Sequence, residues 1–542
     1  MSGPRKIFKP YNQNQLMVFP PSLDELIGVK HPVRVVNQIL DSIDIQPLLR
    51  KYRGGGASSY HPRVMLKVLV YSYMNNIYSS RKMEAACREN IHFMWLAAME
   101  QPDHNTINRF RSDKLKGIIK KIFSQVVILM VDSGHVDLQC VYTDGTKIES
   151  SANKYTFVWG KRIVSSRERI ASQLEELWNY TQQVAAEELK DTAPTHFDDT
   201  DPDAVQRTID TINEALKDKP VDKKIKQKLS YANKNWKKNL ENYKKDEEKL
   251  AGRNSYSKTD EDATFMRMKE DHMKNGQLKP GYNVQISTND QIVTHYSTHQ
   301  NPTDTKTLIP HLEGFYEAYG SMPSAVTADA GYGSEENYEY LVKQGIEAYV
   351  KYNYFDKNQR NKPDYKASFS PDYLHYSASL NCFFCPIGQK MYFVGSREET
   401  TEAGYVKTLH RYQATNCNGC PLRSACHHGK GNRVIEVSLR LRTLKENARE
   451  LLLSEKGIMH RKKRPVDVEP VFGMIKQNRN FRRFLLKGLE KVNIELGLIF
   501  LAHNLRKKVK KQLSEPAKHL YNALLALQGS SKYDYRRQIS LS

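Results

Sequence analysis

The chain has 542 residues, of which 83 are Lys or Arg and 61 are Asp or Glu, and its formal net charge is +22. This length provides about two to four domains with cores of their own. The excess positive charge is typical of proteins that bind nucleic acid, although a merely basic soluble protein carries the same signature. No run approaches the roughly 18 apolar residues of a membrane span, and the first residues lack the apolar segment of a signal peptide. We therefore expect a cytoplasmic protein that uses no membrane.

Residues 1–135 are predicted to be mostly helical. Apolar residues recur at helical spacing in 31–52, in 62–76 and in 103–123, where Asp103 is a plausible helix cap. Two helices joined by a short bend, the later one basic, are typical of a helix-turn-helix and predict an N-terminal DNA-binding domain. The alternative is an ordinary solvated helix face. The side chains expected to point outward from the last helix are His104, Asn108, Arg111 and Lys114.

The next segment, 136–160, is predicted to supply the first strand of a catalytic core. The alternating apolar run 138–144 ends at Asp144, and a Gly follows at once, so we expect the strand to end there. Residues 161–265 are charged and helix-prone, yet they keep an apolar stripe that includes Trp236. This predicts a helical insertion, such as an antiparallel hairpin. It would contact DNA or a second protomer, or would serve only as a spacer.

The core is predicted to resume in residues 266–355. An antiparallel hairpin is expected from 281–288 and 291–298, because apolar residues alternate on both sides of a short turn. A further strand over 325–329 ends at Asp329. A second carboxylate is therefore expected at the C-terminal end of a strand.

Five of the seven cysteines crowd into residues 382–426, inside a segment 356–440 that is predicted to form another insertion. Two Cys-x2-Cys pairs and one further Cys are typical of a tetrahedral structural zinc site, which a reduced compartment favours over disulfides. The alternative is a set of free buried thiols. The five residues are Cys382, Cys385, Cys417, Cys420 and Cys426.

Segment 441–512 is predicted to close the core. Glu469 opens a stretch with helical apolar spacing, and Lys476 falls on the same helix face two turns later. Carboxylates from three unlike contexts, Asp144, Asp329 and Glu469, suit a site for hard divalent cations such as Mg2+. With 61 acidic residues in the chain, the alternative is three unrelated caps and turns.

The sequence around these acids resembles the DDE transposases of bacterial insertion sequences. The resemblance rests on TDGTKIESSANKY around Asp144, DATFMRMKEDHMKNGQLKPGYNVQI before the hairpin, ADAGYG around Asp329, and VEPVFGMIKQNRNFRRFLLKGLEKV from residue 468. It implies an α/β fold with an RNase H-like mixed sheet, in which the first and fourth strands lie side by side and bring the two aspartates together. It also implies catalysis by Asp144, Asp329 and Glu469 with two Mg2+ ions, or with Mn2+ in their place.

In the branch that the chain resembles, the Glu belongs to a signature of Tyr, Arg, Glu and Lys. Lys476 has the expected place, seven residues after Glu469. The Arg should lie four residues before the Glu, where this chain has Pro465, and Arg464 stands one place earlier. The segment contains no Tyr, and His460 is the nearest substitute. The resemblance implies that Lys476 and Arg464 contact DNA phosphate.

The resemblance also implies how the cysteines are used and what the whole protein does. It favours zinc binding by Cys385, Cys417, Cys420 and Cys426, with Cys382 as the alternative ligand. The implied function is a transposase that binds the terminal inverted repeats of its element, cuts there and joins the freed ends to target DNA. It would work as a homodimer on double-stranded DNA in the bacterial nucleoid. The alternatives are a metal-dependent nuclease that does not join DNA, and a domesticated DNA-binding protein.

The predicted fold is thus an RNase H-like core interrupted by two insertions and preceded by a helical domain. The tail, 513–542, carries few structural signals and is expected to be mobile. In chain order the predicted segments are 1–135, 136–160, 161–265, 266–355, 356–440, 441–512 and 513–542.

Overall fold

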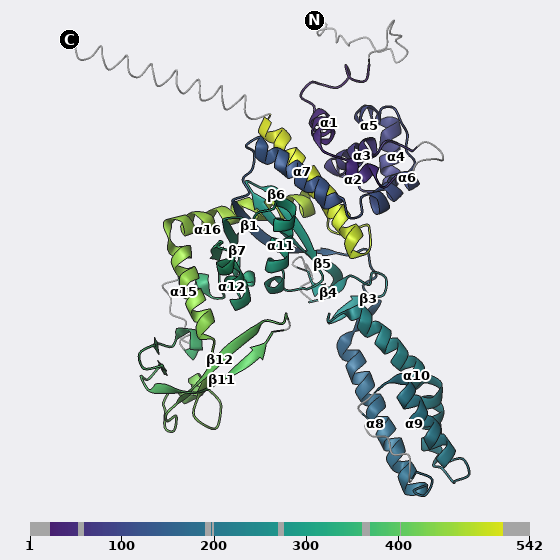
Figure 1. The fold of residues 1–542 in the computed structure, drawn as a ribbon, viewed down its shortest axis with the longest axis vertical. Helices are drawn as coiled ribbons and strands as arrows, with labels where there is room; N and C mark the ends of the chain where they lie inside the picture. Colours follow the sequence, from purple (N-terminus) through teal and green to yellow (C-terminus); the bar gives the residue numbers. More distant parts are fainter. Residues whose placement is uncertain are drawn as a thin grey trace, which may run out of the picture. The chain divides into compact units, whose positions relative to one another are not determined.

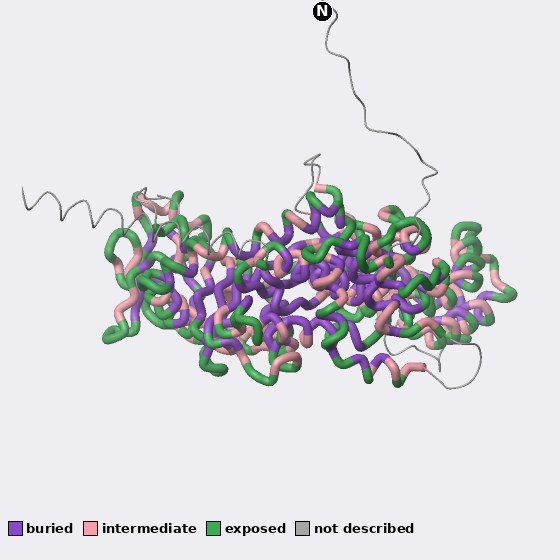
Figure 2. The backbone as a smooth tube through the Cα atoms, turned by 90° about the horizontal axis from the view of Figure 1, so that it is seen from above, coloured by how far each residue is buried: buried purple, intermediate pink, exposed green. Residues whose placement is uncertain are grey.

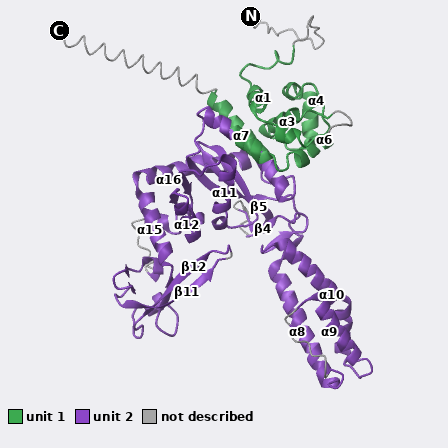
Figure 3. Cartoon of the chain, in the orientation of Figure 1, with its two compact units in different colours: residues 1–126, 498–542 green, residues 127–497 purple. Residues whose placement is uncertain are grey.

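The computed structural model describes residues 22–52, 59–189, 197, 200–268, 276–359, 369–401 and 403–512, so the predicted tail lies outside the described residues. The chain divides into two compact units, residues 1–126 with 498–542 and residues 127–497 (Figure 3). Within the described ranges, no helix combines the length and the apolar character that a membrane span requires.

The first unit is helical over its described part. Asp103 caps the sixth helix as predicted, because its side chain accepts hydrogen bonds from the backbone N–H groups of Asn105 and Thr106. The third helix forms the centre of the unit, with most of its residues buried. The helices are α1 (Pro32–Ser42), α2 (Gln46–Leu49), α3 (Pro62–Met74), α4 (Ser80–Glu89), α5 (Ile91–Leu96) and α6 (His104–Arg109).

The prediction of one continuous helix over 103–123 is wrong. After α6 comes a π-helical turn, η1 (Phe110–Lys114), and α7 (Ile119–Asp132) begins only beyond Gly117, whose φ is +69°. A π turn widens the helix and changes the direction of the side chains that follow. Arg111 was expected to point outward, but it is 4% exposed and donates a hydrogen bond to the carbonyl oxygen of Tyr78.

The second unit contains a six-stranded mixed sheet (Figure 1). The first strand pairs antiparallel with the hairpin and parallel with the strand that precedes Asp329. The predicted hairpin and the predicted pairing of the first and fourth core strands are therefore confirmed, and the mixed sheet is consistent with an RNase H-like core. The strands run in the order β4 (Thr264–Arg267), β5 (Leu278–Asn289), β1 (Cys140–Glu149), β7 (Ala325–Ala328) and β8 (Glu347–Val350), and β6 (Ile292–His299) pairs with β5.

The prediction that Asp144 ends its strand is wrong. β1 continues to Glu149, and Asp144 pairs with Ile286 of β5 well inside the strand. Gly145 is needed for another reason, since a Cβ there would lie 2.4 Å from the side-chain nitrogen of Gln285. Asp329, by contrast, directly follows β7 as predicted and caps the short turn η3 (Ala330–Tyr332).

Helices pack against this sheet and close a hydrophobic core. All four residues of β7 are buried. Figure 2 shows the buried residues of the chain in purple. The core around β7 and β8 includes Phe315, Tyr338 and Leu452 from three different helices. The helical elements of this part are η2 (Asp304–Lys306), α11 (Leu308–Tyr319), α12 (Glu335–Lys343), α13 (Phe355–Asn358), α15 (Leu439–Leu453), α16 (Glu455–Asp467), α17 (Glu469–Gly473) and the π turn η6 (Met474–Asn478). A last helix covers 489–512, and its residues from 498 onward belong to the first unit.

The predicted helical insertion is a three-helix bundle with its own apolar core. Its helices are α8 (Gly160–Val184), α9 (Pro202–Ala215) and α10 (Lys223–Leu250). Trp178 of α8, Ile209 of α9 and Trp236 of α10 are all buried in one cluster. Strands β2 (Phe157–Trp159) and β3 (Ser255–Ser257) pair where the chain enters and leaves the bundle.

The cysteine-rich segment forms a five-stranded antiparallel sheet. Its small core contains Phe383, Tyr412 and Ile435. In spatial order the strands are β13 (Val434–Val437), β12 (Val406–Ala414), β11 (Lys390–Thr400), β10 (Cys382–Phe384) and β9 (Tyr376–Ser377), and the short helix α14 (Arg423–Cys426) precedes β13.

Candidate active site

One guanidinium group brings the three predicted acids together. Nη2 of Arg464, on α16, lies 3.2 Å from Oδ1 of Asp144 and 3.7 Å from Oδ2 of Asp329. Nη1 of the same side chain lies 3.5 Å from Oε1 of Glu469. The side chains become more exposed along this series, from 10% for Asp144 to 40% for Asp329 and 56% for Glu469. The three carboxylates therefore converge on one point, and the site is most open beside Glu469.

Each aspartate is held by the backbone of a glycine that follows it. The N–H of Gly145 donates to Oδ1 of Asp144 at 2.8 Å, and the N–H of Gly331 donates to Oδ1 of Asp329 at 2.8 Å. At Asp329 this bond leaves Oδ2 to face Arg464, whereas at Asp144 the same Oδ1 accepts from Gly145 and lies nearest Arg464. The two acids are thus fixed by local backbone geometry as well as by the sheet.

A fourth carboxylate, which the sequence reasoning missed, lies beside the two aspartates. Oδ1 of Asp304 accepts hydrogen bonds from Asn283 at 2.8 Å and from Gln285 at 3.0 Å. A Cβ built on Gly145 would lie 2.9 Å from this oxygen, and one on Gly331 would lie 3.6 Å from Oδ2. Asp304 stands in a segment, NPTDTKT, that looks like an ordinary helix start, and only the folded hairpin places it at the site.

Burial and three carboxylates of the site raise the pKa of a tyrosine, Tyr332. Burial is the main cause that raises the pKa of Tyr332 well above its ordinary value, and the charge of Asp304 is the next. Asp144 and Asp329 raise the pKa of Tyr332 further. The hydroxyl of Tyr332 therefore stays protonated and donates a hydrogen bond to Oε1 of Gln285. Negative charge is accordingly concentrated where these side chains meet.

The structure places Lys476 inside the protein. It lies in the π turn η6, its relative exposure is 5%, and its Nζ donates to the carbonyl oxygen of Lys147 at 2.9 Å. Glu469 is 56% exposed by side chain whereas Lys476 is buried, so the two side chains lie in different surroundings, although the sequence predicts that they share one helix face. The expectation assumes regular α-helical spacing, and the π turn that contains Lys476 changes the direction in which its side chain points.

The polar residues expected to face DNA in the first unit lie in different settings. Nδ1 of His104 lies 2.7 Å from Oε2 of Glu84, and Nζ of Lys114 donates to the carbonyl oxygen of Lys51 at 2.8 Å. Asn108 is exposed, as predicted. Oδ1 of Asn108 accepts a hydrogen bond from Nη2 of the buried Arg111, so all four of these polar groups make contacts within the unit itself.

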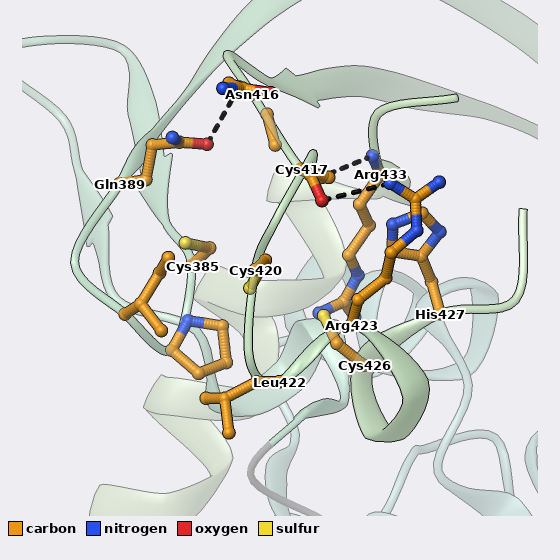
Figure 4. Close-up of a pocket in the computed structure, with 13 residues that line it drawn as sticks. Cys385, Gln389, Asn416, Cys417, Cys420, Leu422, Arg423, Cys426, His427 and Arg433 are labelled. Atoms are coloured by element: carbon orange, nitrogen blue, oxygen red, sulfur yellow. Dashed lines mark hydrogen bonds between the residues drawn. The ribbon is translucent and has the colours of Figure 1, made fainter. Parts of the chain in front are cut away.

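Four cysteines line one pocket in the cysteine-rich segment (Figure 4). The backbone N–H of Arg433 donates to Sγ of Cys417 at 3.4 Å, and Nη1 of the same residue donates to Sγ of Cys426 at 3.0 Å. His427 also lines the pocket, and its buried Nε2 makes no hydrogen bond. Cys382 is fully buried in β10 and is not among the lining residues. The four lining cysteines are Cys385, Cys417, Cys420 and Cys426.

In the described part of the chain, no group of three or more His, Cys, Asp or Glu side chains has the geometry to hold a metal ion as it stands. The donor atoms are nevertheless of two distinct kinds. Carboxylate oxygens gather around Arg464, and thiol sulfurs gather around Arg433. Oxygen donors suit Mg2+ or Mn2+, whereas four sulfur donors suit Zn2+.

Two families of known proteins match the chain. Residues 21–113 match the family described as transposase domain (DUF772), and residues 384–509 match the family described as transposase DDE domain. The second match contains Arg464, Glu469 and Lys476, whereas Asp144 and Asp329 precede it. No curated protein matches the chain.

Both matched families are transposase families, and the class of the protein is therefore a transposase. Within this class, the two matches support a DDE transposase of an insertion sequence.

Proposed function

We propose that the protein binds the terminal inverted repeats of its own element, cuts phosphodiester bonds there and joins the freed 3′ hydroxyl to target DNA. The observation that carries this proposal is the convergence of Asp144, Asp329 and Glu469 on the guanidinium of Arg464. A cluster of oxygen donors from two strands and a helix is what metal-dependent phosphoryl transfer requires.

The charge of this site suits divalent cations. Three formally ionised carboxylates against one guanidinium leave two negative charges, and Asp304 adds another nearby. Bound Mg2+ or Mn2+ ions would activate the attacking oxygen and stabilise the leaving oxygen of the phosphodiester. Asp144, Asp329 and Glu469 would hold these cations. We assign no ligand role to Asp304, because its Oδ1 already accepts two hydrogen bonds.

The remaining residues of the site would position the reacting groups. Arg464 reaches all three acids, so it offsets their repulsion and would contact the DNA phosphate when cations are bound. Lys476 bonds to the carbonyl of Lys147, three residues beyond Asp144 on β1. We therefore propose that Lys476 supports the site by fixing β1, in place of the phosphate contact that the resemblance implies.

We also propose that the cysteine pocket holds a structural Zn2+ ion on Cys385, Cys417, Cys420 and Cys426. All four sulfurs border one pocket, and the N–H and guanidinium groups of Arg433 donate hydrogen bonds to two of them, so the sulfurs face a polar surround. The ion would join α14 and its loops to the edge of the sheet. We leave Cys382 out of this set, because it is buried in β10 and does not line the pocket.

For the helical N-terminal unit we propose a role in holding the element ends. The match of residues 21–113 to a transposase domain supports this assignment, and Asn108 is exposed on the surface of the unit. A homodimer would hold two ends at once.

The test is incubation of the purified protein with labelled duplexes that carry the flanking ends, with Mg2+ or with EDTA. Wild type should give Mg2+-dependent cuts at the end boundary and joined products. Asp329→Ala should bind the ends but give neither product. Asp372→Ala serves as the matched control, because this aspartate is 53% exposed by side chain and pairs with Lys445 away from the acids of the site.

The other outcomes separate the alternatives. Cuts without joined products would support a nuclease. Binding without cuts in any condition would support a DNA-binding protein. Equal activity of wild type and Asp329→Ala would remove Asp329 from the site.

A further inference from the structure

In the long helix of the insertion, the acidic residues are confined to the C-terminal part, and the N-terminal part is strongly basic. Helix α10 runs from Lys223 to Leu250, and between Lys223 and Leu240 it contains no Asp or Glu. Its acidic residues, Glu241 and three in the last turns, come only after this stretch. The lysines of the acid-free stretch are Lys223, Lys224, Lys226, Lys228, Lys234, Lys237 and Lys238.

Two of these lysines hold the bundle together. Lys228 lies 2.8 Å from Glu176 of α8, and Lys237 lies 2.8 Å from Asp203 of α9. Near the end of the helix, Lys249 forms a third ion pair, with Glu261 at 2.6 Å. The charges of these lysines are therefore neutralised within the protein.

Other lysines form a separate stripe on the solvent side of α10. Lys224, Gln227, Tyr231, Lys234 and Lys238 follow one another at steps of three or four residues, so they lie on one face of the helix. We call these five residues the basic stripe. All five are exposed, Tyr231 by 57%, and the apolar residues of α10 face the other way into the bundle core. None of the three stripe lysines forms an ion pair with a residue in the described ranges.

We propose that the basic stripe binds the phosphate backbone of duplex DNA without reading its sequence. Lys224 and Lys238 are 14 positions apart, which is about 21 Å along a helix and roughly the rise of six base pairs. Ammonium groups are point charges that contact phosphate but do not specify a base. The hydroxyl of Tyr231 and the amide of Gln227 add hydrogen-bond donors of the kind found at phosphate contacts.

A second copy of the chain is a poorer occupant for this face. The net charge of +22 means that one copy meets another with mostly like charge, and two basic stripes would repel each other. This inference rests on the proposed function only in taking DNA as the substrate. The insertion would thereby add affinity for DNA outside the catalytic acids.

The test measures DNA binding by the full-length protein in EDTA, so that no cleavage contributes. Fluorescence anisotropy with a random duplex of ~30 base pairs would be recorded at several salt concentrations. The stripe variant is Lys224→Gln, Lys234→Gln and Lys238→Gln together. The matched control is Lys228→Gln, Lys237→Gln and Lys249→Gln, which removes the same charge from the same helix at paired positions.

We expect the slope of log K against log salt to become shallower by about 2 to 3 in the stripe variant, since each lost phosphate contact contributes ~0.9. The control should change the slope by less than ~1. Equal changes in the two variants would overturn the proposal, and so would an unchanged slope in the stripe variant. Because EDTA removes catalysis from the measurement, failure here would leave the proposed cleavage and joining untouched.

Discussion

Asp144 and Asp329 occupy matching positions of two adjacent parallel strands. The last backbone pair of β1 and β7 joins Tyr142 to Thr327, and each aspartate lies two residues further along its own chain segment. Neighbouring strands are about 4.8 Å apart, so this register alone brings the two carboxylates close enough to share one cation. Long insertions between the two strands do not disturb it, because the sheet and not the connecting chain sets the distance.

Arg464→Met should tighten the binding of Mn2+ while lowering cleavage by about 100-fold or more. The guanidinium lies within 4 Å of a carboxylate oxygen of each of the three acids, so its removal leaves their negative charge to the cations. Electron paramagnetic resonance titration and single-turnover cleavage measure the two effects. Arg464→Lys, which keeps a charge but lacks the fork, should lie between. Weaker Mn2+ binding in Arg464→Met would mean that Arg464 builds the cation site instead.

Gly145→Ala should destabilise the protein by about 1–3 kcal/mol. The added Cβ would lie 2.4 Å from Nε2 of Gln285, and Gln285 is fully buried and bonded to Asp304, so it has little room to move. Gly473→Ala is the matched control, because nothing lies within 4 Å of its added Cβ and it closes a helix. The control should be neutral or stabilising by roughly 0.5–1 kcal/mol. Denaturant unfolding checks both, and equal stabilities would contradict the packing described at β1.

Stability should fall as the pH drops below the ordinary range of a histidine, and His460 should contribute to this fall. Burial lowers the pKa of His460 below its ordinary value, and Nδ1 lies 2.9 Å from the hydroxyl of Tyr142. The unfolded chain then binds more protons than the folded chain at acid pH, so folding is favoured above about pH 6.5 and weakened below it.

The change of Tm between pH 7.5 and pH 5.5 should therefore be smaller in His460→Phe than in wild type. The other histidines are the same in both proteins and cancel in the comparison. An identical change of Tm in the two proteins would exclude His460 as a source of the pH dependence.

Cys420→Ser should lose bound zinc, whereas Cys382→Ser should keep it. Cys420 lines the pocket with the other three proposed ligands, and Cys382 is buried in β10 outside it. The wild type should contain about one zinc per chain by mass spectrometry of the metal, since four thiolates complete one tetrahedral site. A wild-type protein without zinc would contradict the proposed zinc site. Loss of zinc from Cys382→Ser but not from Cys420→Ser would mean that Cys382 is a ligand in place of Cys420.

The sequence predicted the acids of the site better than their local structure. Asp144, Asp329 and Glu469 were found because each lies in a distinctive segment; the sheet brings the two aspartates together as expected, and helix α17 adds Glu469. The prediction that the strand ends at Gly145 is wrong, because a glycine in a sequence usually indicates a turn. A glycine can also be required inside a strand where a side chain of the neighbouring strand comes close, and the sequence does not show this. Gln285 supplies that missing reason.

Two further errors have one cause. Arg111 and Lys476 both lie in π turns, where one extra residue per turn changes which side chains face inward. Apolar spacing assumes a regular α-helix and cannot reveal such turns. Asp304 was missed because its place at the site depends on hydrogen bonds from Asn283 and Gln285 of the hairpin. No motif in the sequence links these two residues to Asp304.

The dependence of the acid cluster on Arg464 and Glu469 has a consequence for protein synthesis. Asp144 is synthesised early, and more than half of the chain's length must then be translated before Arg464 and Glu469 complete the cluster. At about 5–20 residues per second, this interval lasts on the order of half a minute. Nascent and prematurely terminated chains that end before α16 would therefore carry the N-terminal helices without a complete set of acids, and under the proposed function they would be unable to cut DNA.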